Sequence, residues 1–296
     1  MLVTDESEAE LRPQINSIEE LWIPLDGVRV RCQRAGSGPP LLLVHGLMGY
    51  SFSWRHTVPE LAQHATVYAL DLPGTGFSER PQGMDCGLGA SAERLLRFMD
   101  SVGLRRCDLL GTSHGGAVAM MAAALASERI QRLILVAPVN PWSAHGRRLS
   151  VFLSSPPIAP IFMKLAPRLG ILQDFYFRRL WGDTRRIQPG TLAGYMKPLL
   201  RPGAFKYGIG VLRSWNQDLA ELASRLPKIA DIPILLVWGS LDAAVSPASA
   251  AMLRQQFRDC RLLILEGVGH LPYEEVPGEF NRAVLQYLLS DHRCLH

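Results

Sequence analysis

The sequence contains few cysteines, and no spacing pattern connects them. Its 296 residues include five cysteines at scattered positions, none of which form a C-x-x-C motif: Cys32, Cys86, Cys107, Cys260 and Cys294. An odd count without regular spacing argues against a disulfide framework and against a structural zinc site. We therefore expect reduced cysteines with mostly structural roles and a cytoplasmic location.

Signatures of metal, cofactor and nucleic-acid binding are also missing. The eight histidines include no H-x-H or H-E-x-x-H pattern, in which two histidines are spaced to share a metal ion. The sequence shows neither a helix-turn-helix pattern nor the mixture of aromatic and basic residues that nucleic-acid binding uses. We expect no metal, no cofactor and no nucleic-acid partner.

Long hydrophobic runs are absent as well. The longest apolar-looking region, residues 151–172, is interrupted by four prolines and contains Lys164 and Arg168, so it does not resemble a membrane span. Residues 1–20 hold six acidic residues and one basic residue, Arg12, whereas a signal peptide has a basic start followed by an apolar stretch. We expect a polar N-terminal extension at residues 1–20 and neither a signal peptide nor a transmembrane segment.

The composition is that of a globular protein. Hydrophobic residues make up 48% of the chain and charged residues 20%, and the length suffices for one large α/β domain with insertions or for two modest domains. The net charge of +4 is unevenly placed, because residues 140–225 hold 13 Lys and Arg against 4 Asp and Glu. The ordinary interpretation is a solvated basic surface. The alternative is a face that binds an acidic carrier protein or an anionic lipid surface.

Short apolar runs alternate with helix-like segments over most of the chain. After two strands joined by an Asp26-Gly27 turn, continuous apolar runs indicate strands buried on both faces of a parallel sheet. The predicted strands are 21–24, 28–34, 41–44, 66–70, 107–110, 132–136, 234–238 and 261–265, and the predicted helices are 57–63, 91–102, 114–126, 247–257 and 278–289. This alternation predicts an open, doubly wound α/β sheet.

The alternation stops after the sixth predicted strand and resumes at the seventh. Residues 138–229 are rich in Pro, Arg, Trp and Tyr and show no buried-strand pattern. Long insertions of this kind are usually lids or binding elements. We expect most of the aromatic residues there to form the core of the insertion: Trp142, Phe152, Phe162, Phe175, Tyr176, Phe177, Trp181 and Tyr195.

A serine between glycines follows the fifth predicted strand. In Gly111-Thr112-Ser113-His114-Gly115 the chain must turn sharply from a strand into a helix, and small residues at Gly111 and Gly115 prevent clashes across the turn. This is the G-x-S-x-G nucleophile elbow, in which the backbone N–H of His114 can stabilise an oxyanion at the helix N-terminus. The alternative is a glycine-rich turn with an incidental serine.

Candidates for the base and acid that a nucleophilic serine needs follow two later strands. Asp242 comes just after strand 234–238, and His270 lies on a glycine-rich loop after strand 261–265. The carboxyl ends of parallel strands face a common crevice, so the three side chains can meet. Alone, His270 could be a hydrogen-bonded loop histidine and Asp242 a turn or cap residue. The alternative acids are Asp218, Asp231 and Glu266.

From residue 21 to residue 289 the sequence resembles the α/β-hydrolase fold superfamily. The resemblance rests on the segments 45–49 (HGLMG), 71–78 (DLPGTGFS), 111–116 (GTSHGG), 238–242 (WGSLD) and 269–270 (GH). It implies a catalytic triad of Ser113, His270 and Asp242, with backbone oxyanion donors at Leu47 and His114. It also implies that the His45 side chain bonds nearby backbone, that the Asp71 loop packs beside the elbow, and that catalysis needs no cofactor.

The resemblance also separates branches of the superfamily. Its epoxide hydrolases and haloalkane dehalogenases place an aspartate where this chain has Ser113, which argues against both chemistries. Its carbon–carbon bond hydrolases usually have Asn before the serine and Met after it, whereas this chain has Thr112 and His114.

These observations predict an α/β-hydrolase fold with a helical cap inserted after the sixth strand. The expected core comprises residues 21–139 and 230–296, and the expected cap residues 140–229. The predicted function is a carboxylesterase-like or lipase-like serine hydrolase that forms an acyl-enzyme from an apolar ester. Alternatives are a carbon–carbon bond hydrolase, an esterase or thioesterase for carrier-bound acyl chains, and a hydrolase-fold ligand-binding receptor with slow turnover.

Overall fold

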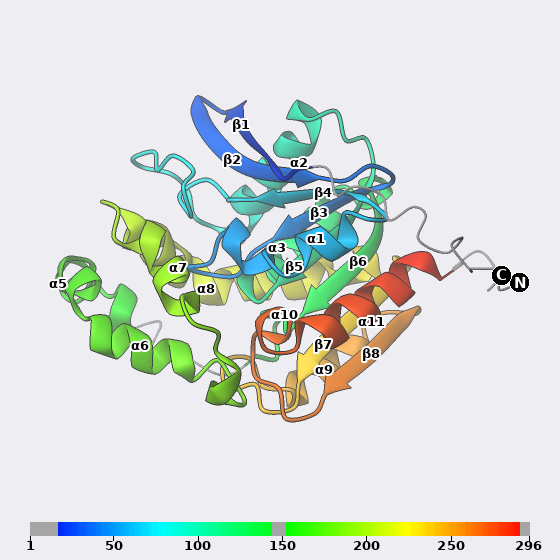
Figure 1. Ribbon diagram of the computed structural model, residues 1–296. Helices are drawn as coiled ribbons and strands as arrows, with labels where there is room; N and C mark the ends of the chain where they lie inside the picture. The colour runs from blue at the N-terminus through cyan, green and yellow to red at the C-terminus, as the bar shows by residue number, and fades with distance from the viewer. Residues whose placement is uncertain (1–16, 144–151, 291–296) are drawn as a thin grey trace, which may run out of the picture.

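A single eight-stranded sheet forms the centre of the computed structural model, which describes residues 17–143 and 152–290 (Figure 1). The strand order is β1-β2-β4-β3-β5-β6-β7-β8; β2 pairs antiparallel with both β1 and β4, and all other neighbours are parallel. All eight predicted strands are present: β1 (Glu19–Leu25), β2 (Val28–Ala35), β3 (Pro40–Val44), β4 (Thr66–Leu70), β5 (Cys107–Thr112), β6 (Ile130–Val136), β7 (Ile234–Gly239) and β8 (Cys260–Leu265). The predicted doubly wound α/β-hydrolase fold is confirmed.

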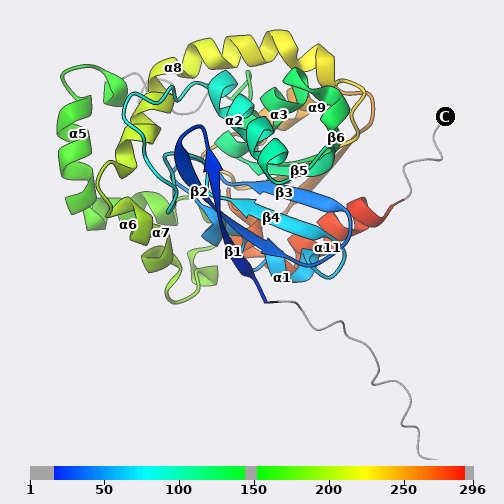
Figure 2. The same cartoon turned by 90° about the horizontal axis from the view of Figure 1, so that it is seen from above.

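The central strands are apolar at consecutive positions because helices cover both faces of the sheet. Successive side chains of β3 alternate between the two faces, so Leu42 and Val44 join one hydrophobic cluster and Leu41 and Leu43 join the other. Seen from above, α2 (Leu88–Ser101), α3 (His114–Leu125) and α9 (Ala248–Arg254) lie on one side of the strands, and α1 (Val58–Leu61) and α11 (Pro277–Leu289) lie on the other (Figure 2).

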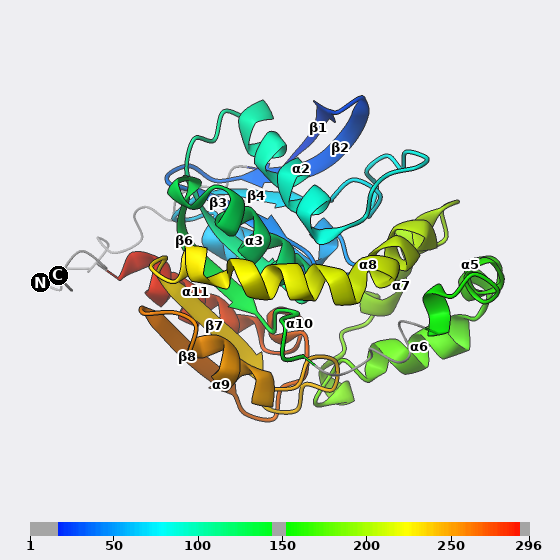
Figure 3. The same ribbon diagram turned by 180° about the vertical axis from the view of Figure 1, so that it is seen from behind.

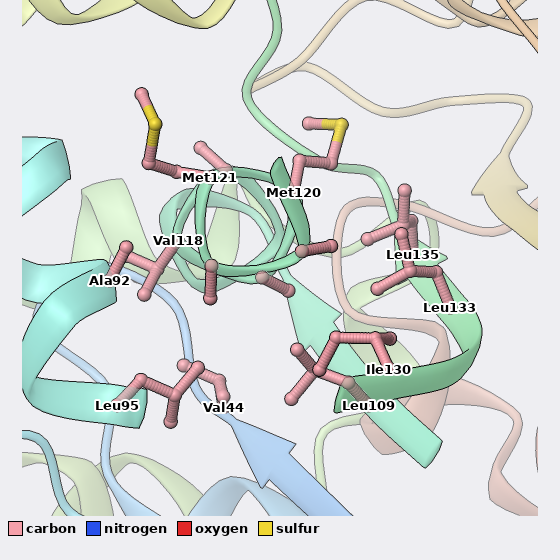
Figure 4. Packing of buried hydrophobic residues seen from close by; sticks show 14 of the residues in the cluster. Val44, Ala92, Leu95, Leu109, Val118, Met120, Met121, Ile130, Leu133 and Leu135 are labelled. Carbon is pink, nitrogen blue, oxygen red and sulfur yellow. The ribbon is translucent and has the colours of Figure 1, made fainter. Parts of the chain in front are cut away.

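Helix α3 is surrounded by protein on all sides. Its first eleven residues are all buried, as expected for a helix that is apolar around its whole circumference. Figure 4 shows Val118, Met120 and Met121 of α3 among side chains from α2 and the strands: Val44, Ala92, Leu95, Leu109, Ile130, Leu133 and Leu135. The residue that precedes α3 is therefore held by a rigid frame.

Several helix boundaries differ from those predicted. Helix α1 is shorter than the predicted 57–63 because its last turn tightens into 3₁₀ hydrogen bonds from Gln63 and His64. Helix α2 begins earlier than predicted, and α9 covers less than 247–257. The short helix α10 (Pro272–Glu275) was not predicted. It begins at a proline, which is favoured at the first position of a helix, and a second proline, Pro277, follows it.

In the described part of the segment between β6 and β7, four helices with given bounds lie at one end of the sheet (Figures 1 and 3). They are α5 (Ala159–Leu165), α6 (Gly170–Arg178), α7 (Thr191–Leu199) and α8 (Ala204–Arg225). The predicted insertion after the sixth strand is confirmed. Helix α8 runs back along the molecule, and its Leu219 and Leu222 join the hydrophobic cluster around α3 (Figure 3).

The aromatic residues of the inserted segment divide into two groups. Trp181 and Tyr195 are buried and Trp142, Phe162 and Phe177 are half-buried, as predicted for a core of the insertion. The exceptions are Phe152, Phe175 and Tyr176, each more than half exposed.

Five 3₁₀ turns complete the described elements: Ser51–Trp54, Ser127–Arg129, Ala166–Arg168, Thr184–Arg186 and Leu226–Ile229. Within residues 17–143 and 152–290, no helix combines the length and the apolar character that crossing a membrane would require.

Candidate active site

Ser113 lies on a strained turn between β5 and α3. Its backbone angles are φ 53° and ψ −123°, a conformation that costs a non-glycine residue about 1–3 kcal/mol. The turn is held by hydrogen bonds, since the Ser113 amide donates to the Val136 carbonyl at 2.9 Å and the Ser113 carbonyl accepts from Gly116 and Val139 at 3.0 Å each. The serine is thus fixed at the carboxyl edge of the sheet.

The glycines around Ser113 are required by close backbone contacts. A Cβ at Gly111 would lie 2.5 Å from the Gly115 carbonyl oxygen, and a Cβ at Gly115 would lie 2.2 Å from the His45 carbonyl oxygen. Both distances are shorter than real Cβ contacts. The glycine spacing therefore lets α3 begin directly against β5 and the loop after β3.

Asp242 and His270 are joined by a buried hydrogen bond. His270 Nδ1 donates to Asp242 Oδ2 at 2.7 Å, and both side chains are almost completely buried. The other carboxylate oxygen accepts from the amides of Ala244 and Val245 at 2.8 and 2.9 Å, which fixes its orientation. An ionised carboxylate only accepts hydrogen bonds, so the proton sits on Nδ1 and Nε2 is free to act as a base.

The three alternative acids lie elsewhere. Asp231 pairs with Arg258 at 2.5 Å on the surface, and Glu266 accepts from the Ser240 hydroxyl at 3.0 Å. Asp218 accepts from the Ser214 hydroxyl at 2.7 Å on α8. The structure therefore pairs His270 with Asp242, as the sequence predicted.

Ser113 and His270 lie at the same edge of the sheet, with two strands between the strands that they follow. Ser113 follows β5 and His270 follows β8, in the strand order β5-β6-β7-β8, and both lie beyond the carboxyl ends of parallel strands. Tyr273, three residues after His270, lies near Thr112. Among the described residues no hydrogen bond joins Ser113 Oγ to His270 Nε2, and such bonds often tighten only when substrate is bound.

Two backbone amides beside Ser113 are free to receive an oxyanion. A Cβ placed on Gly46 would lie 3.2 Å from the Ser113 Cβ, so the loop after β3 runs directly past the serine. Within the described chain, the amides of Leu47 and His114 donate to no other residue. These are the two amides that the resemblance to the superfamily led us to expect as oxyanion donors.

The His45 side chain stabilises this loop. Its Nδ1 donates to the Gly46 carbonyl at 2.8 Å, and its Nε2 accepts from the Leu72 amide at 3.1 Å. Burial lowers the pKa of His45, which keeps the imidazole neutral for this pair of bonds. Nearby, the buried Asp71 carboxylate accepts from the amides of Ser51 and Phe77 at 2.7 and 2.9 Å. The His45 side chain thus bonds nearby backbone, as expected.

The His114 imidazole is buried in an aromatic environment. Its ring centroid lies 6.2 Å from that of Tyr207 and 6.5 Å from that of Trp215, both on α8. Burial lowers the pKa of His114 to about 4, so its side chain is neutral near pH 7. His114 is the first residue of α3, so its backbone amide lies at the helix N-terminus.

Two adjacent buried glutamates on α10 were not predicted. Glu275 accepts from the amides of Gly182, Asp183 and Gly269 at 2.9–3.0 Å, and Arg186 Nη1 lies 3.1 Å from it. In addition, the His270 amide donates to the Leu180 carbonyl at 2.7 Å. The loop that carries His270 is thereby bound to the segment after α6.

Glu274 makes the second of these connections. It forms a two-pronged ion pair with Arg55, and it accepts from the Tyr195 hydroxyl at 2.6 Å. Arg55 also donates to Thr191 Oγ1 at 3.0 Å, so α7 is tied to the end of the loop after β3. In the sequence, both glutamates look like ordinary acidic residues in a first helical turn, and only their closeness to His270 distinguishes them.

No cofactor is implied by these contacts. Between residues 17 and 143 and between residues 152 and 290, the structure contains no cluster of three or more His, Cys, Asp or Glu side chains able to hold a metal ion. What the site offers is a hydroxyl, an oriented imidazole and two free amides.

Comparisons with known proteins agree with the fold. A family model described as the alpha/beta hydrolase family matches residues 41–283. The chain is 28% identical over 285 residues to haloalkane dehalogenase 2 of Mycobacterium tuberculosis (strain ATCC 25618 / H37Rv), covering 93% of this chain and 96% of that protein. It is also 28% identical over 265 residues to the pimeloyl-(acyl-carrier protein) methyl ester esterase of Aeromonas salmonicida (strain A449), covering 88% and 99%.

A solved structure adds a third relative. The crystal structure of a membrane phospholipase A, described as a novel bacterial virulence factor, superposes with a TM-score of 0.74 at 26% identity. The match covers 92% of this chain and 86% of that one. With its eight-stranded sheet and the matching family model, the chain is a hydrolase that belongs to the alpha/beta hydrolase family.

Proposed function

We propose that the protein is a serine hydrolase that cleaves carboxylic esters with an apolar acyl or alcohol group. One observation carries the proposal: Ser113 is held in a strained conformation beside two free amides, on the same sheet edge as the His270–Asp242 pair. Strained turns of this kind are maintained where the exposed hydroxyl is needed as a nucleophile.

The first half-reaction forms an acyl-enzyme. His270 Nε2 removes the proton of the Ser113 hydroxyl as Oγ attacks the ester carbonyl carbon. The carbonyl oxygen becomes an oxyanion and accepts hydrogen bonds from the amides of Leu47 and His114. When the carbonyl re-forms, the ester C–O bond breaks and His270 gives its proton to the departing alcohol.

The second half-reaction releases the acid. His270 removes a proton from a water molecule, whose oxygen attacks the acyl carbon, and it then returns the proton to Ser113. Asp242 keeps the imidazole in the tautomer with Nδ1 protonated and stabilises the imidazolium that forms twice in the cycle.

The relatives support an ester more than a carbon–halogen bond. The Aeromonas relative is named as an esterase. Dehalogenases of this fold use a carboxylate nucleophile, whereas this chain has a serine at that position. The 28% identity to a dehalogenase therefore does not indicate cleavage of a carbon–halogen bond.

We propose that residues 140–229 act as the cap over this site. Aromatic rings of the loop after β3 and of α7 form one cluster, in which Phe52 lies 5.6 Å from Tyr50 and 5.3 Å from Tyr195 between ring centroids. Gly208 of α8 lies against Met48, next to the oxyanion loop. These contacts join apolar side chains of the inserted segment to the loop that passes Ser113, which supports an apolar substrate.

The proposal is tested with a fluorophosphonate, which labels activated serines. Intact mass is measured for the wild type, for Ser113→Ala and for a control, Ser224→Ala, on the exposed part of α8, with short-chain and long-chain p-nitrophenyl esters assayed alongside. We expect one adduct and ester turnover in the wild type and the control, and neither in Ser113→Ala.

Other outcomes would contradict the proposal in different ways. An adduct on Ser113 without ester turnover would favour cleavage of another bond, as in a carbon–carbon bond hydrolase. Neither adduct nor turnover, together with ligand-dependent thermal stabilisation, would favour a ligand-binding receptor.

A further inference from the structure

Large apolar side chains are exposed on the two outermost helices of the inserted segment. Helices α5 and α6 lie beyond α7 and the start of α8, at the end of the molecule farthest from the sheet (Figures 1 and 3). Six large apolar side chains on and next to these helices are between 41% and 56% exposed: Phe152, Ile161, Leu165, Leu169, Phe175 and Tyr176. We call this set, with the basic residues described next, the cap-tip surface.

Basic side chains are interleaved with the apolar ones. Ile161, Lys164, Leu165 and Arg168 recur at helical spacing along α5 and the following 3₁₀ turn, so they share one face. On α6, the Arg179 guanidinium lies 5.8 Å from the ring centroid of Phe175. Within the described chain Lys164, Arg168 and Arg179 have no carboxylate partner, and Asp174 is the single acidic residue from 152 to 179.

The exposed side chains are distinct from those that hold the helices in place. Phe162 packs against Phe205 of α8 with ring centroids 5.9 Å apart. Phe177 packs against Trp181 and Tyr195 at 4.6 and 5.0 Å. Because Phe162 and Phe177 already anchor α5 and α6, the outward apolar residues have no evident role in folding, and exposing them to water costs free energy.

We propose that the cap-tip surface binds an anionic lipid membrane. Apolar and aromatic side chains with Lys and Arg at neighbouring positions are the pattern of helices that lie in a membrane interface, where apolar groups enter the acyl region and basic groups meet lipid phosphates. The two helices lie at one end of the molecule, away from the sheet, where a membrane could reach them (Figures 1 and 3). The long stems of Lys164 and Arg168 can lie along the apolar groups while their charges reach the headgroups.

The cap-tip surface is connected through α6 to the loop that carries His270. Helix α6 leads within a few residues to Leu180 and Gly182, which contact the His270 loop through the Leu180 carbonyl and Glu275. A membrane bound at α5 and α6 would therefore lie on the side of the active site. Binding itself requires no turnover, so the proposal holds whether or not the protein cleaves esters.

The experiment is flotation of the full-length protein with vesicles of phosphatidylcholine, alone or mixed with phosphatidylglycerol, at low and high salt. We expect binding to the anionic vesicles that weakens with salt. Phe175→Ser with Tyr176→Ser should lower the partition coefficient about tenfold or more, through lost apolar burial. Lys164→Glu with Arg168→Glu should lower it at least about 20-fold, because each basic residue near the surface contributes roughly fivefold.

Matched controls are exposed residues outside the cap-tip surface. Met252→Ser on α9, whose parent side chain is 43% exposed, and Arg105→Glu after α2 should leave binding unchanged. Circular dichroism and Tm should be the same for all variants, because every altered side chain is exposed. Absence of wild-type binding to anionic vesicles at low salt, or equal binding by the cap-tip variants, would overturn the proposal. Light scattering that shows a dimer lost in the cap-tip variants would instead assign the surface to a second copy of this chain.

Discussion

Glu275 Oε2 accepts a hydrogen bond from the Gly269 amide at 2.9 Å, so a carboxylate with no exposed surface holds the residue that precedes His270. The same side chain accepts from the amides of Gly182 and Asp183 and pairs with Arg186. A single buried anion therefore connects the loop of the proposed catalytic base with the segment between β6 and β7. The position of the imidazole and the position of the inserted segment are coupled through it.

Replacing this anion should misplace the imidazole. In Glu275→Gln, one of the two acceptor oxygens becomes an NH2 group that faces backbone amide donors, so at least one bond must break. We expect kcat to fall about 10–100-fold, because small displacements of a catalytic group have effects of that size. Ester turnover is measured well below the Tm of the variant, with kcat and KM determined separately.

The control for this change is Glu279→Gln, which removes an exposed glutamate from the first turn of α11. It should keep wild-type kcat and Tm. A purely structural role for Glu275 would give a lower Tm with an unchanged kcat in the folded variant, and that result would contradict a positioning role.

Asp242→Asn should remove the orientation of the base. The carboxylate of Asp242 faces only donors, namely His270 Nδ1 and the amides of Ala244 and Val245. An asparagine must direct its NH2 group at one of them, which favours the imidazole tautomer with the proton on Nε2. We expect kcat to fall about 10⁴-fold with little change in KM.

Asp231→Asn and Glu266→Gln are the matched controls for Asp242, since each is an acid at a comparable place in the sequence. Both carboxylates have partners away from His270. Because surface interactions of this kind contribute little, each substitution should leave kcat within about twofold of the wild-type value. A large loss in either, with activity retained in Asp242→Asn, would reverse the assignment.

Much of the fold and the core of the site could be predicted from the sequence because they depend on local patterns. The Asp26-Gly27 turn identified the first two strands, continuous apolar runs identified the other six, and the glycines around Ser113 identified the turn into α3. The order Ser113, Asp242, His270 followed from positions after strands. In each case the pattern lies within a few residues, and the geometry of a parallel sheet brings the distant segments together.

Contacts between segments that lie far apart in the chain could not be predicted from such local patterns. Glu274 and Glu275 stand in the first turn of a short helix, where acidic residues are common because of the helix dipole. Their partners Arg55, Tyr195 and Gly182 lie far away in the sequence and show no matching pattern. The same limit applies to Phe175 and Tyr176, whose exposure depends on how α6 packs rather than on its composition.

A methyl group at Gly115 should prevent the elbow from forming. The added Cβ would lie 2.2 Å from the His45 carbonyl and 2.5 Å from the Val44 carbonyl, both backbone atoms that cannot move aside cheaply. We expect Gly115→Ala to lower the free energy of unfolding by several times RT or to prevent folding. Activity should be lost in either case. Urea unfolding followed by fluorescence gives the free energy of unfolding.

Gly89→Ala is the matched change at a position without such contacts. Gly89 lies in α2, and a Cβ there would meet no atom within 4 Å. Alanine in a helix is favoured over glycine, so this variant should be about 0.5–1 kcal/mol more stable than the wild type and fully active. Equal effects of the two substitutions would show that close approach at the elbow is not what requires glycine.

Acid should destabilise the protein through His114. Burial lowers the pKa of this imidazole to about 4 in the folded state, whereas its ordinary value is 6.5. Between these pH values the unfolded chain binds a proton that the folded chain does not, so the free energy of unfolding falls as the pH falls. The contribution amounts to roughly 3 kcal/mol once the pH reaches the folded-state pKa.

A glutamine at position 114 keeps the backbone amide and removes the titrating ring. Urea unfolding of His114→Gln at a series of pH values between about 4 and 7 should therefore show a shallower loss of stability than the wild type. Part of the loss should remain, because burial lowers the pKa of His45 in the same direction. His64→Gln, at an exposed position before β4, should keep the wild-type slope. An unchanged slope in His114→Gln would mean that the folded protein accommodates the charged imidazole, which the burial of this side chain argues against.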